Sequence, residues 1–492
     1  MESSILSDRT KNTIMNMHSN LICFIIICFL GHSCAANKAI ISSGQSAHYT
    51  DIDRKGTFVI DKEIDLHGDK MILPQCERIV FVNDGCIKNG HVVLHLSTYS
   101  IEGGNGIFEN VVIESNVKTS NDIKCSLPEI NARWFGAVGD AKTDNSKAIQ
   151  NAIESAHSLS VPVFLPRGNY LISNHLSLYE GDILMGEYAG MLTPNHQKGA
   201  TFIRYIGSEK EMVQVEGRYV TISNVVLATK STYETNGIEL LNDAGLYFCM
   251  NNVLIANTKY GVHSLLEDGK GFSECLWDRV KIWNCVRGVS IDIRQKANQY
   301  ITYNCFTNVS VSNAKECGFY FHCAAINSCS FRDCLFENIG YGKVCDPQYK
   351  SNIISAIYLT NEAQQGNVII DGGYFENIYY GKEEVSNDIN IYKNSSVISV
   401  KNMVVSIRDI RLTNTATVVT SRGLDIITIN NCIDNGYLGK GNSNIPVCQA
   451  NTNTSVEVNG YMFSNKNKKI VQDSLSIKAK VSNMRLIDGS IK

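Results

Sequence analysis

Seven copies of one short pattern between Val220 and Asn414 constrain the fold of this chain more than any other feature. Each copy contains an apolar pair, a small polar residue, a second apolar pair, and then Asn or Thr. By subtraction, successive copies are 28, 27, 29, 25, 39 and 37 residues apart, and they end at Thr229, Asn257, Asn284, Asn313, Asn338, Asn377 and Asn414. Spacings in this range predict stacked structural repeats.

Within each copy the apolar residues recur at every second position, which indicates strands. One such unit cannot bury its own apolar face, so the units must stack, and three inward files of side chains describe a parallel β-helix. The first predicted file is Ile222, Met250, Trp277, Phe306, Phe331, Ile370 and Ile407. The second is Val225, Val253, Val280, Val309, Cys334, Gly373 and Ile410, and the third is Leu227, Ile255, Ile282, Val311, Phe336, Phe375 and Leu412.

A polar column separates the first two files. It consists of Asn224, Asn252, Arg279, Asn308, Asp333, Gly372 and Asp409. Short polar side chains suit a tight bend, where they bond the neighbouring backbone. Asparagines can also form a ladder between coils about 4.8 Å apart. We therefore predict a structural role for these residues.

The composition narrows the possible partners. The chain has 45 basic and 48 acidic residues and no basic cluster, which argues against nucleic acid as a partner. Its 17 cysteines include no matched CxxC pairs, which argues against a cysteine metal site, and disulfide pairing cannot be deduced from their spacing. Cys275 and Cys329 fall on predicted inward positions.

Residues 1–36 have the character of an export signal. Two basic residues precede the run LICFIIICFL, which ends in GHSCAA, and ten apolar residues are too few to cross a bilayer. We therefore expect a secreted, cell-surface or periplasmic protein. Soluble export and lipid anchoring at Cys34 remain alternatives. No later stretch reaches transmembrane length.

The rest of the chain divides into three predicted parts. Residues 37–129 form small β coils, residues 130–435 form the main β-helix, and residues 436–492 form closing strands. The main β-helix begins with a short α-helix. Asp144 or Asn145 can cap the N-terminus of this α-helix. Its predicted apolar face contains Ile149, Ala152, Ile153 and Ala156.

The opening segment resembles the pectate lyase superfamily of right-handed β-helix proteins, which is related to polygalacturonases and rhamnogalacturonases. The resemblance rests on Trp134-Phe135-Gly136-Ala137, Gly139-Asp140, Thr143-Asp144-Asn145, Ala148-Ile149-Gln150, Leu165-Pro166-Arg167-Gly168-Asn169-Tyr170 and Leu184-Met185-Gly186-Glu187. It implies an all-β, right-handed parallel β-helix with a short capping α-helix, and a structural role for Asp140 and Asp144. It supplies no active site, because the polygalacturonase motifs Asn-Thr-Asp, Asp-Asp, Gly-His-Gly and Arg-Ile-Lys are absent from the corresponding repeats.

The strand that follows each asparagine turn is the predicted location of the site, because loops of variable length flank it and the resembling families bind sugar there. Alternation places Asp292, His322 and Thr360 in one outward row. Ser290, Tyr320 and Tyr358 form the neighbouring row. A carboxylate, an imidazole and two aromatic rings suit a polysaccharide, with the rings covering the apolar face of a sugar. The alternative is a solvated face whose tyrosines stabilise adjacent coils.

Eight residues are candidates for chemistry or binding. Asp292, Glu316, His322 and Glu362 are the catalytic candidates, and Tyr320, Tyr358, Arg287 and Arg294 are the substrate-binding candidates. Hydrolysis with inversion needs two carboxyl groups, for which Asp292 with Glu316 or Glu362 is favoured. A lyase would need a base, such as His322 or a tyrosine, and a cation such as Arg294.

A rival cluster lies on another predicted sheet. Glu337 and Glu376 share a register in successive coils, close to Asp333 and Asp371. Such spacing suits a retaining pair, a calcium site or a solvated face. No cofactor is predicted, and calcium is the one alternative. The insertions 339–352 and 378–394 are expected to wall one end of the main groove.

These features predict an exported enzyme that degrades an acidic or neutral polysaccharide, including uronic-acid polymers. Hydrolysis is favoured over β-elimination. The alternative is a non-catalytic glycan-binding or surface-structural protein on the same scaffold.

Overall fold

The computed structural model describes residues 40–41, 56–116, 125–190, 199–230, 233–295, 298–341, 354–362, 366–381, 395–435, 446–450, 454–463, 478–483 and 485–486. The predicted export signal and most of both insertions lie outside these residues. The chain divides into two compact units, Met1–Pro128 and Glu129–Lys492. In the described part of the chain, no helix has the length and hydropathy needed to cross a membrane.

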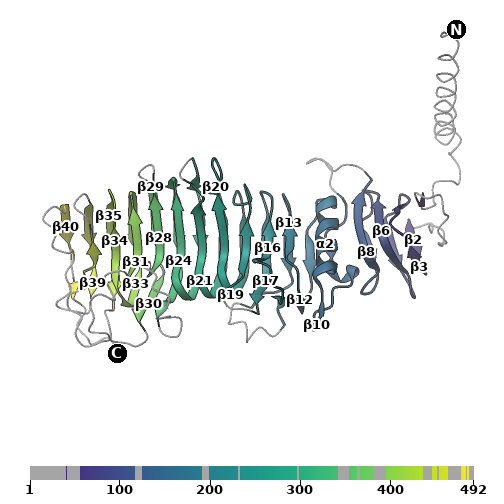
Figure 1. Cartoon of the computed structure of the whole chain (residues 1–492), viewed down its shortest axis with the longest axis horizontal. Coiled ribbons are helices and arrows are strands. Elements are labelled where there is room, and N and C mark those ends of the chain that lie inside the picture. The colour runs from purple at the N-terminus through teal and green to yellow at the C-terminus, as the bar shows by residue number, and fades with distance from the viewer. Residues whose placement is uncertain are drawn as a thin grey trace, which may run out of the picture. The chain divides into compact units, whose positions relative to one another are not determined.

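The first unit consists of short, mostly parallel coils (Figure 1). Its strands are β1 (Ile40–Ile41), β2 (Thr57–Ile60), β3 (Glu63–Asp65), β4 (Lys70–Ile72), β5 (Arg78–Phe81), β6 (Cys86–Leu94), β7 (Ser100–Glu102) and β8 (Phe108–Ser115). β2, β5 and β7 pair in parallel, as do β3, β4 and β8 with β6, whereas β1 pairs antiparallel with β4. Asn110 Nδ2 donates to Asn89 Oδ1 at 3.0 Å, so an asparagine ladder links coils here as well.

The second unit opens with β9 (Ile130–Asn131), the 3-10 helix η1 (Ala132–Phe135), β10 (Asp140–Asp144), α2 (Ser146–Leu159), β11 (Val163–Leu165) and β12 (Gly168–Ile172). The predicted apolar face of α2 is buried. Asp140 accepts hydrogen bonds from the backbone of Lys142 and Thr143, and Asp144 accepts one from the backbone of Ser146. Asp144 therefore holds the backbone at the start of α2 and Asp140 holds the segment just before it, as their predicted structural role requires.

Parallel coils follow, and they build the right-handed parallel β-helix that the sequence predicts. Its earlier strands are β13 (Leu176–Leu178), β14 (Ile183–Gly186), β15 (Thr201–Tyr205), β16 (Glu211–Val215), β17 (Thr221–Thr229), β18 (Asn236–Leu240), β19 (Cys249–Leu266), β20 (Gly271–Ser273), β21 (Leu276–Ile293), β22 (Tyr300–Thr302), β23 (Cys305–Thr307), β24 (Ser310–Cys323), β25 (Ala325–Asn327), β26 (Cys329–Arg332) and β27 (Leu335–Tyr341).

Its later strands are β28 (Ile354–Asn361), β29 (Gly366–Asp371), β30 (Tyr374–Gly381), β31 (Ser395–Lys401), β32 (Met403–Arg408), β33 (Arg411–Thr415), β34 (Thr417–Ser421), β35 (Ile426–Asn430), β36 (Ile433–Asp434), β37 (Cys448–Gln449), β38 (Ser455–Asn459), β39 (Met462–Phe463), β40 (Lys478–Ser482) and β41 (Arg485–Leu486). Parallel pairing continues beyond Asn435, with β38 against β35 and β40 against β38.

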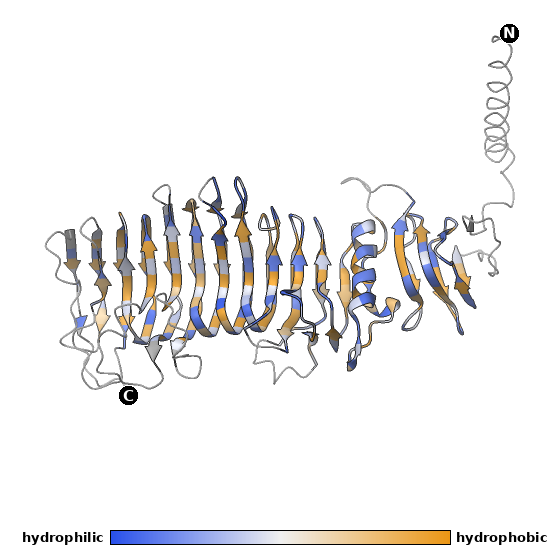
Figure 2. Cartoon of the chain, in the orientation of Figure 1, coloured by the Kyte–Doolittle hydropathy of each residue, from blue (hydrophilic) through white to orange (hydrophobic). Residues whose placement is uncertain are grey.

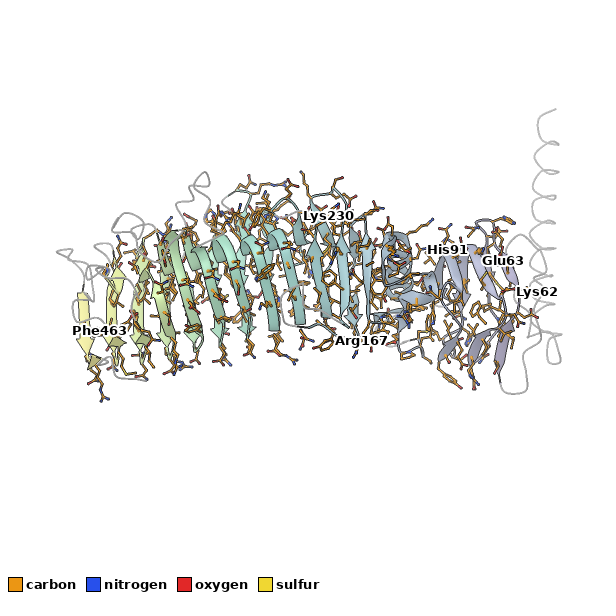
Figure 3. All side chains as sticks on the ribbon, turned by 90° about the horizontal axis from the view of Figure 1, so that it is seen from below. Lys62, Glu63, His91, Arg167, Lys230 and Phe463 are labelled. Carbon is orange, nitrogen blue, oxygen red and sulfur yellow. The ribbon has the colours of Figure 1, made fainter. Side chains whose placement is uncertain are left out.

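The three inward files form the core. Register places Trp277 between Met250 and Phe306, and Phe306 next to Phe331, as predicted. Except for Gly373, the members of all three files are at most 2% exposed. Hydrophobic segments therefore lie at corresponding positions on successive coils (Figure 2). Side chains are present along the whole series of coils (Figure 3).

The asparagine columns mark the bends. Every member of the first column, including Asn224 and Arg279, has a positive φ between 50° and 71°. Asn tolerates this left-handed conformation better than most residues, which explains its recurrence. In this column Asn252 Nδ2 donates to Asn224 Oδ1 at 2.9 Å, so the predicted ladder is present between these two coils. The residues that end the repeats form a second column, in which Asn377 Nδ2 donates to Asn338 Oδ1 at 2.9 Å and Asn414 Nδ2 donates to Asn377 Oδ1 at 2.6 Å. Asparagines in both columns therefore join neighbouring coils.

The described cysteines are thiols, without a disulfide among them. Cys275 and Cys329 are inward and at most 1% exposed, which confirms their predicted positions.

Candidate functional site

The candidate face is the outward surface of the strands that follow the asparagine turns. It runs over β18, the later halves of β19, β21 and β24, and then β28, β31 and β34, which pair in parallel. Ser290 is in register with Tyr320, and Tyr320 with Tyr358. His322 is in register with Thr360, and Thr360 with Lys401. The two outward rows predicted from alternation are therefore present.

A line of alternating charged groups crosses four coils of this face. His322 Nδ1 lies 2.8 Å from Asp292 Oδ1, and His322 Nε2 lies 3.4 Å from Glu362 Oε1. Lys401 Nζ donates to both oxygens of Glu362, at 2.9 and 3.0 Å. The structure thus brings together three of the four catalytic candidates. We call Asp292, His322, Glu362 and Lys401 the charged row.

The charged row is half-buried, which strengthens its interactions. The side chains of Asp292, His322 and Glu362 are 33%, 25% and 13% exposed. The hydrogen bond with Asp292 raises the pKa of His322 from its ordinary value, although burial acts in the opposite direction. Burial would raise the pKa of Asp292, but the hydrogen bonds from His322 and the Ile293 amide lower it below its ordinary value. The pair therefore favours a carboxylate beside an imidazolium.

The fourth catalytic candidate, Glu316, lies apart from the charged row. It is 6% exposed, and its Oε2 accepts a hydrogen bond of 2.5 Å from Arg287 Nε. Burial would lower the pKa of Arg287, but the Glu316 carboxylate raises it above the ordinary value. The register between β21 and β24 shifts at this point, so β24 contains an extra residue between Ala314 and Cys317. This bulge places Glu316 against Arg287.

The two tyrosines of the other row form a stack closed by arginines. The rings of Tyr320 and Tyr358 are 4.9 Å apart and nearly parallel. The Arg287 guanidinium lies 3.8 Å from the Tyr320 ring, and the Arg422 guanidinium lies 4.1 Å from the Tyr358 ring. Both tyrosines are less than 10% exposed. No ring face is open to a sugar, so the expectation of face-on stacking has to be corrected. Only the ring edges and hydroxyl groups of these tyrosines remain for contact with a ligand.

The remaining binding candidate, Arg294, is at the rim of the face. Its side chain is 63% exposed and pairs with Glu267 at 3.0 Å. Sequence reasoning missed two cations, Lys401 and Arg422. Alternation along SVISVK does place Lys401 in the outward row of Thr360, so that signal was present. Arg422 lies just after β34, where no pattern predicts its contact with Tyr358.

The rival cluster has the predicted register, because Glu337 aligns with Glu376. One of its carboxylates, Asp371, is paired, since its Oδ2 accepts a hydrogen bond of 2.5 Å from Arg408. Among the described residues, no group of three or more His, Cys, Asp or Glu side chains is arranged to hold a metal ion.

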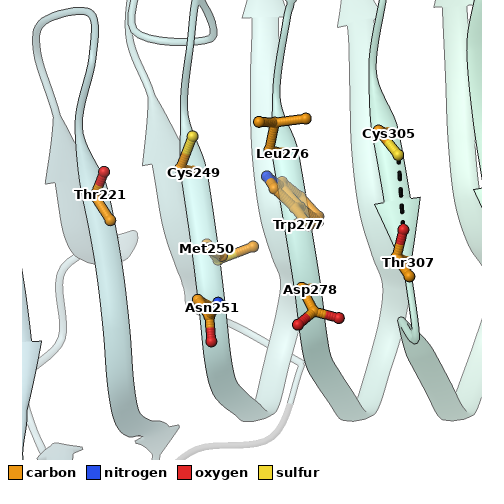
Figure 4. A pocket seen from close by; sticks show the side chains of 9 residues that line it. All are labelled: Thr221, Cys249, Met250, Asn251, Leu276, Trp277, Asp278, Cys305 and Thr307. Carbon is orange, nitrogen blue, oxygen red and sulfur yellow. Dashed lines mark hydrogen bonds between the residues drawn. The ribbon is translucent and has the colours of Figure 1, made fainter.

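A shallow recess of about 350 Å³ lies elsewhere, on the earlier halves of the coils (Figure 4). Its lining residues are Thr221, Cys249, Met250, Asn251, Leu276, Trp277, Asp278, Cys305 and Thr307. Its one carboxylate, Asp278, is paired with Arg279 at 3.0 Å. The recess therefore lacks the partners for acid–base chemistry that the charged row has.

Residues 129–342 match the model of the family described as rhamnogalacturonase A/epimerase, pectate lyase-like. Two curated relatives match over short segments. Alginate lyase 7 of Azotobacter vinelandii is 41% identical over 58 residues, 12% of this chain and 7% of that protein. A glucan 1,3-beta-glucosidase of Cochliobolus carbonum is 30% identical over 82 residues, 17% of this chain and 10% of that protein. This chain thus spans a tenth or less of either relative.

Among solved structures, the enzymatically active domain of tailspike protein 2 from bacteriophage CBA120 has a similar fold. Its TM-score is 0.50 at 14% identity, and the match covers 74% of this chain and 55% of that one. This likeness concerns the fold.

Proposed function

We propose that this chain, which is a pectate lyase-like right-handed β-helix protein, cleaves glycosidic bonds of a polysaccharide on the candidate face. The observation that carries the proposal is the Asp292–His322–Glu362 arrangement, in which two carboxylates contact opposite nitrogens of one imidazole. Three titratable groups joined through one imidazole ring on an outward, half-buried surface are a frequent sign of a functional site. The related proteins named above include a lyase and a glucosidase, which supports carbohydrate as the substrate class.

The environment of each group suggests its role in hydrolysis. The raised pKa of His322 favours the imidazolium, which can protonate the glycosidic oxygen as a general acid. Asp292 fixes Nδ1 of His322 and leaves Nε2 for the substrate, because the Nε2–Glu362 contact of 3.4 Å is long for a hydrogen bond. Glu362 is the proposed base that activates water.

The spacing of the proposed acid and base is short. Nε2 of His322 lies 3.4 Å from Glu362 Oε1, closer than the roughly 6.5–9.5 Å between the two carboxyl groups of inverting glycosidases, so this spacing is not evidence for inversion. In this account a histidine replaces the usual carboxylic acid. Asp292 has a lowered pKa and Glu316 is held by Arg287, so neither is suited to carry the proton.

β-Elimination is the second candidate, and the cations at one end of the face favour it. Lys401 contacts Glu362, and Arg422 donates to Tyr358 Oη at 2.8 Å. Either cation could neutralise the carboxylate of a uronate, as elimination requires. Neutral His322 would then be the base.

Product analysis separates these reactions. The purified protein is incubated with a panel of neutral and uronate polysaccharides, and the products are followed by reducing-end assay, ultraviolet absorbance and mass spectrometry. Reducing ends without an unsaturated chromophore support hydrolysis, whereas the chromophore of unsaturated uronates supports elimination. Binding without any product would favour the alternative of a non-catalytic glycan-binding protein. We further propose export of the chain, on the strength of its N-terminal 36 residues.

A further inference from the structure

A second cluster of titratable groups lies on the same face, on the coils before the charged row. His263 Nδ1 lies 2.8 Å from both carboxylate oxygens of Glu239, and Asn236 Nδ2 donates to Glu239 Oε2 at 2.8 Å. His263 is in register with Ser290, in the coil that carries Asp292. Glu239 is in register with His263, so it lies three coils, or about 14 Å, from His322.

One polar atom in this cluster has an unused hydrogen-bonding capacity. The side-chain carbonyl oxygen of Asn236 is buried and has no hydrogen-bond partner within the described residues. The opposite amide orientation would bring this oxygen against the Glu239 carboxylate, which cannot donate, so the orientation is determined by chemistry. This orientation directs Nδ2 at the Glu239 carboxylate, so Asn236 holds that carboxylate in place.

An aromatic surface borders the cluster. The Tyr260 ring stacks on His263 with centroids 5.0 Å apart, and the Arg287 guanidinium lies 5.7 Å from the same tyrosine ring. The side chains of His263 and Glu239 are 19% and 15% exposed, so both can be reached from solvent. The cluster is thus fixed by internal contacts and open on its outer side, which is the arrangement of a preformed binding position.

The charge of the cluster indicates what it would accept. Glu211 is in register with Asn236, and burial together with the nearby Glu239 carboxylate raises the pKa of Glu211. The neighbouring carboxylates of Glu211 and Glu239 would repel the carboxylate of a charged sugar, whereas Lys259, whose Nζ lies 5.1 Å from the Tyr260 ring, acts in the opposite direction. An uncharged sugar has hydroxyl groups that can donate to the Glu239 carboxylate.

We propose that Glu211, Asn236, Glu239, Tyr260 and His263 form a subsite for an uncharged sugar unit, about three coils from His322. The proposal extends the proposed function, because it places the non-reacting part of the same glycan on these coils. At roughly 5 Å per coil, a chain of about four sugar units along the helix axis would reach from this subsite to the charged row.

The test measures the affinity of two hexasaccharides of equal length, glucohexaose and hexagalacturonate, by isothermal titration calorimetry. Wild type is compared with the double variant Glu211→Gln/Glu239→Gln. Glu216→Gln, an exposed residue on the Glu211 coil, is the matched control for loss of charge. The double variant is expected to bind glucohexaose at least about threefold more weakly and hexagalacturonate about tenfold more tightly, and the control should match wild type.

An unchanged ratio of the two affinities in the double variant would overturn the subsite, and so would the absence of glucohexaose binding to wild type. Failure of the proposed function has a different signature. If His322→Ala still cleaves polysaccharide while the double variant changes the affinity ratio, the proton-transfer role is wrong and the subsite stands. If the double variant loses kcat with KM unchanged, the cluster acts in the reaction and is not a binding subsite.

Discussion

The imidazole of His322 lies between two carboxylates that the sequence places far apart, with Nδ1 2.8 Å from Asp292 and Nε2 3.4 Å from Glu362. Asp292 and Glu362 are separated by 70 positions, and stacking of the coils brings them to the same imidazole ring. Proton transfer at this ring is the chemistry on which our account depends, and the predictions below test it together with the packing that supports it.

Asp292→Asn should shift the fall of kcat on the alkaline side of the pH profile to lower pH. The carboxylate raises the pKa of His322, so the imidazolium that acts as the acid persists above the ordinary value of 6.5, and activity is lost as pH rises through the raised pKa. A neutral amide lowers that pKa, so the loss begins at lower pH. Initial rates from about pH 4 to 9 measure this fall. Asp278→Asn, on another face, should behave as wild type, and an unshifted fall in Asp292→Asn would show that a different group titrates.

Glu316→Gln should lower stability more than it lowers kcat. Breaking a buried ion pair leaves one charge unpaired, at a cost of about 3 kcal/mol, and here the Arg287 and Glu316 side chains are only 15% and 7% exposed. Denaturant unfolding measures the change. Glu267→Gln removes one member of the exposed Arg294 pair and should cost less than about 1 kcal/mol. A stable Glu316→Gln variant with kcat reduced a hundredfold would instead make Glu316 catalytic.

Asn377→Ala should be less stable than Asn377→Gly. Both substitutions remove the ladder bonds to Asn338 and Asn414, but the φ of 54° at this position strains alanine by about 1–2 kcal/mol and leaves glycine unstrained. Thermal unfolding followed by circular dichroism gives the order of the two variants. Equal or reversed stabilities would mean that backbone conformation is not the reason for asparagine in this column.

The sequence predicts the fold in detail because each coil contributes the same few positions to the same files. Ile222, Trp277 and Phe306 occupy one file, as their spacing requires. The same alternation predicts the row of Asp292 and His322. The closed outer face of Tyr358 could not be predicted, because it depends on Arg422 from a later coil.

The sequence did not predict the position of Glu316 either. One extra residue in β24, between Ala314 and Cys317, directs Glu316 away from the charged row and against Arg287. The spacing between copies of the repeat carries no information about such a bulge. The contact of Glu316 with Arg287, which the repeat pattern does not predict, therefore keeps Glu316 away from the other three catalytic candidates.

The most direct test of the account is kcat of His322→Ala on a polysaccharide that the wild type cleaves. His67→Ala, whose side chain is 77% exposed in the first unit, serves as the control. We predict that His322→Ala retains the wild-type thermal unfolding curve within a few degrees and loses about 100- to 10,000-fold in kcat, the usual contribution of a general acid or base, while His67→Ala is unchanged. A His322→Ala variant that cleaves at the wild-type rate would contradict proton transfer at His322.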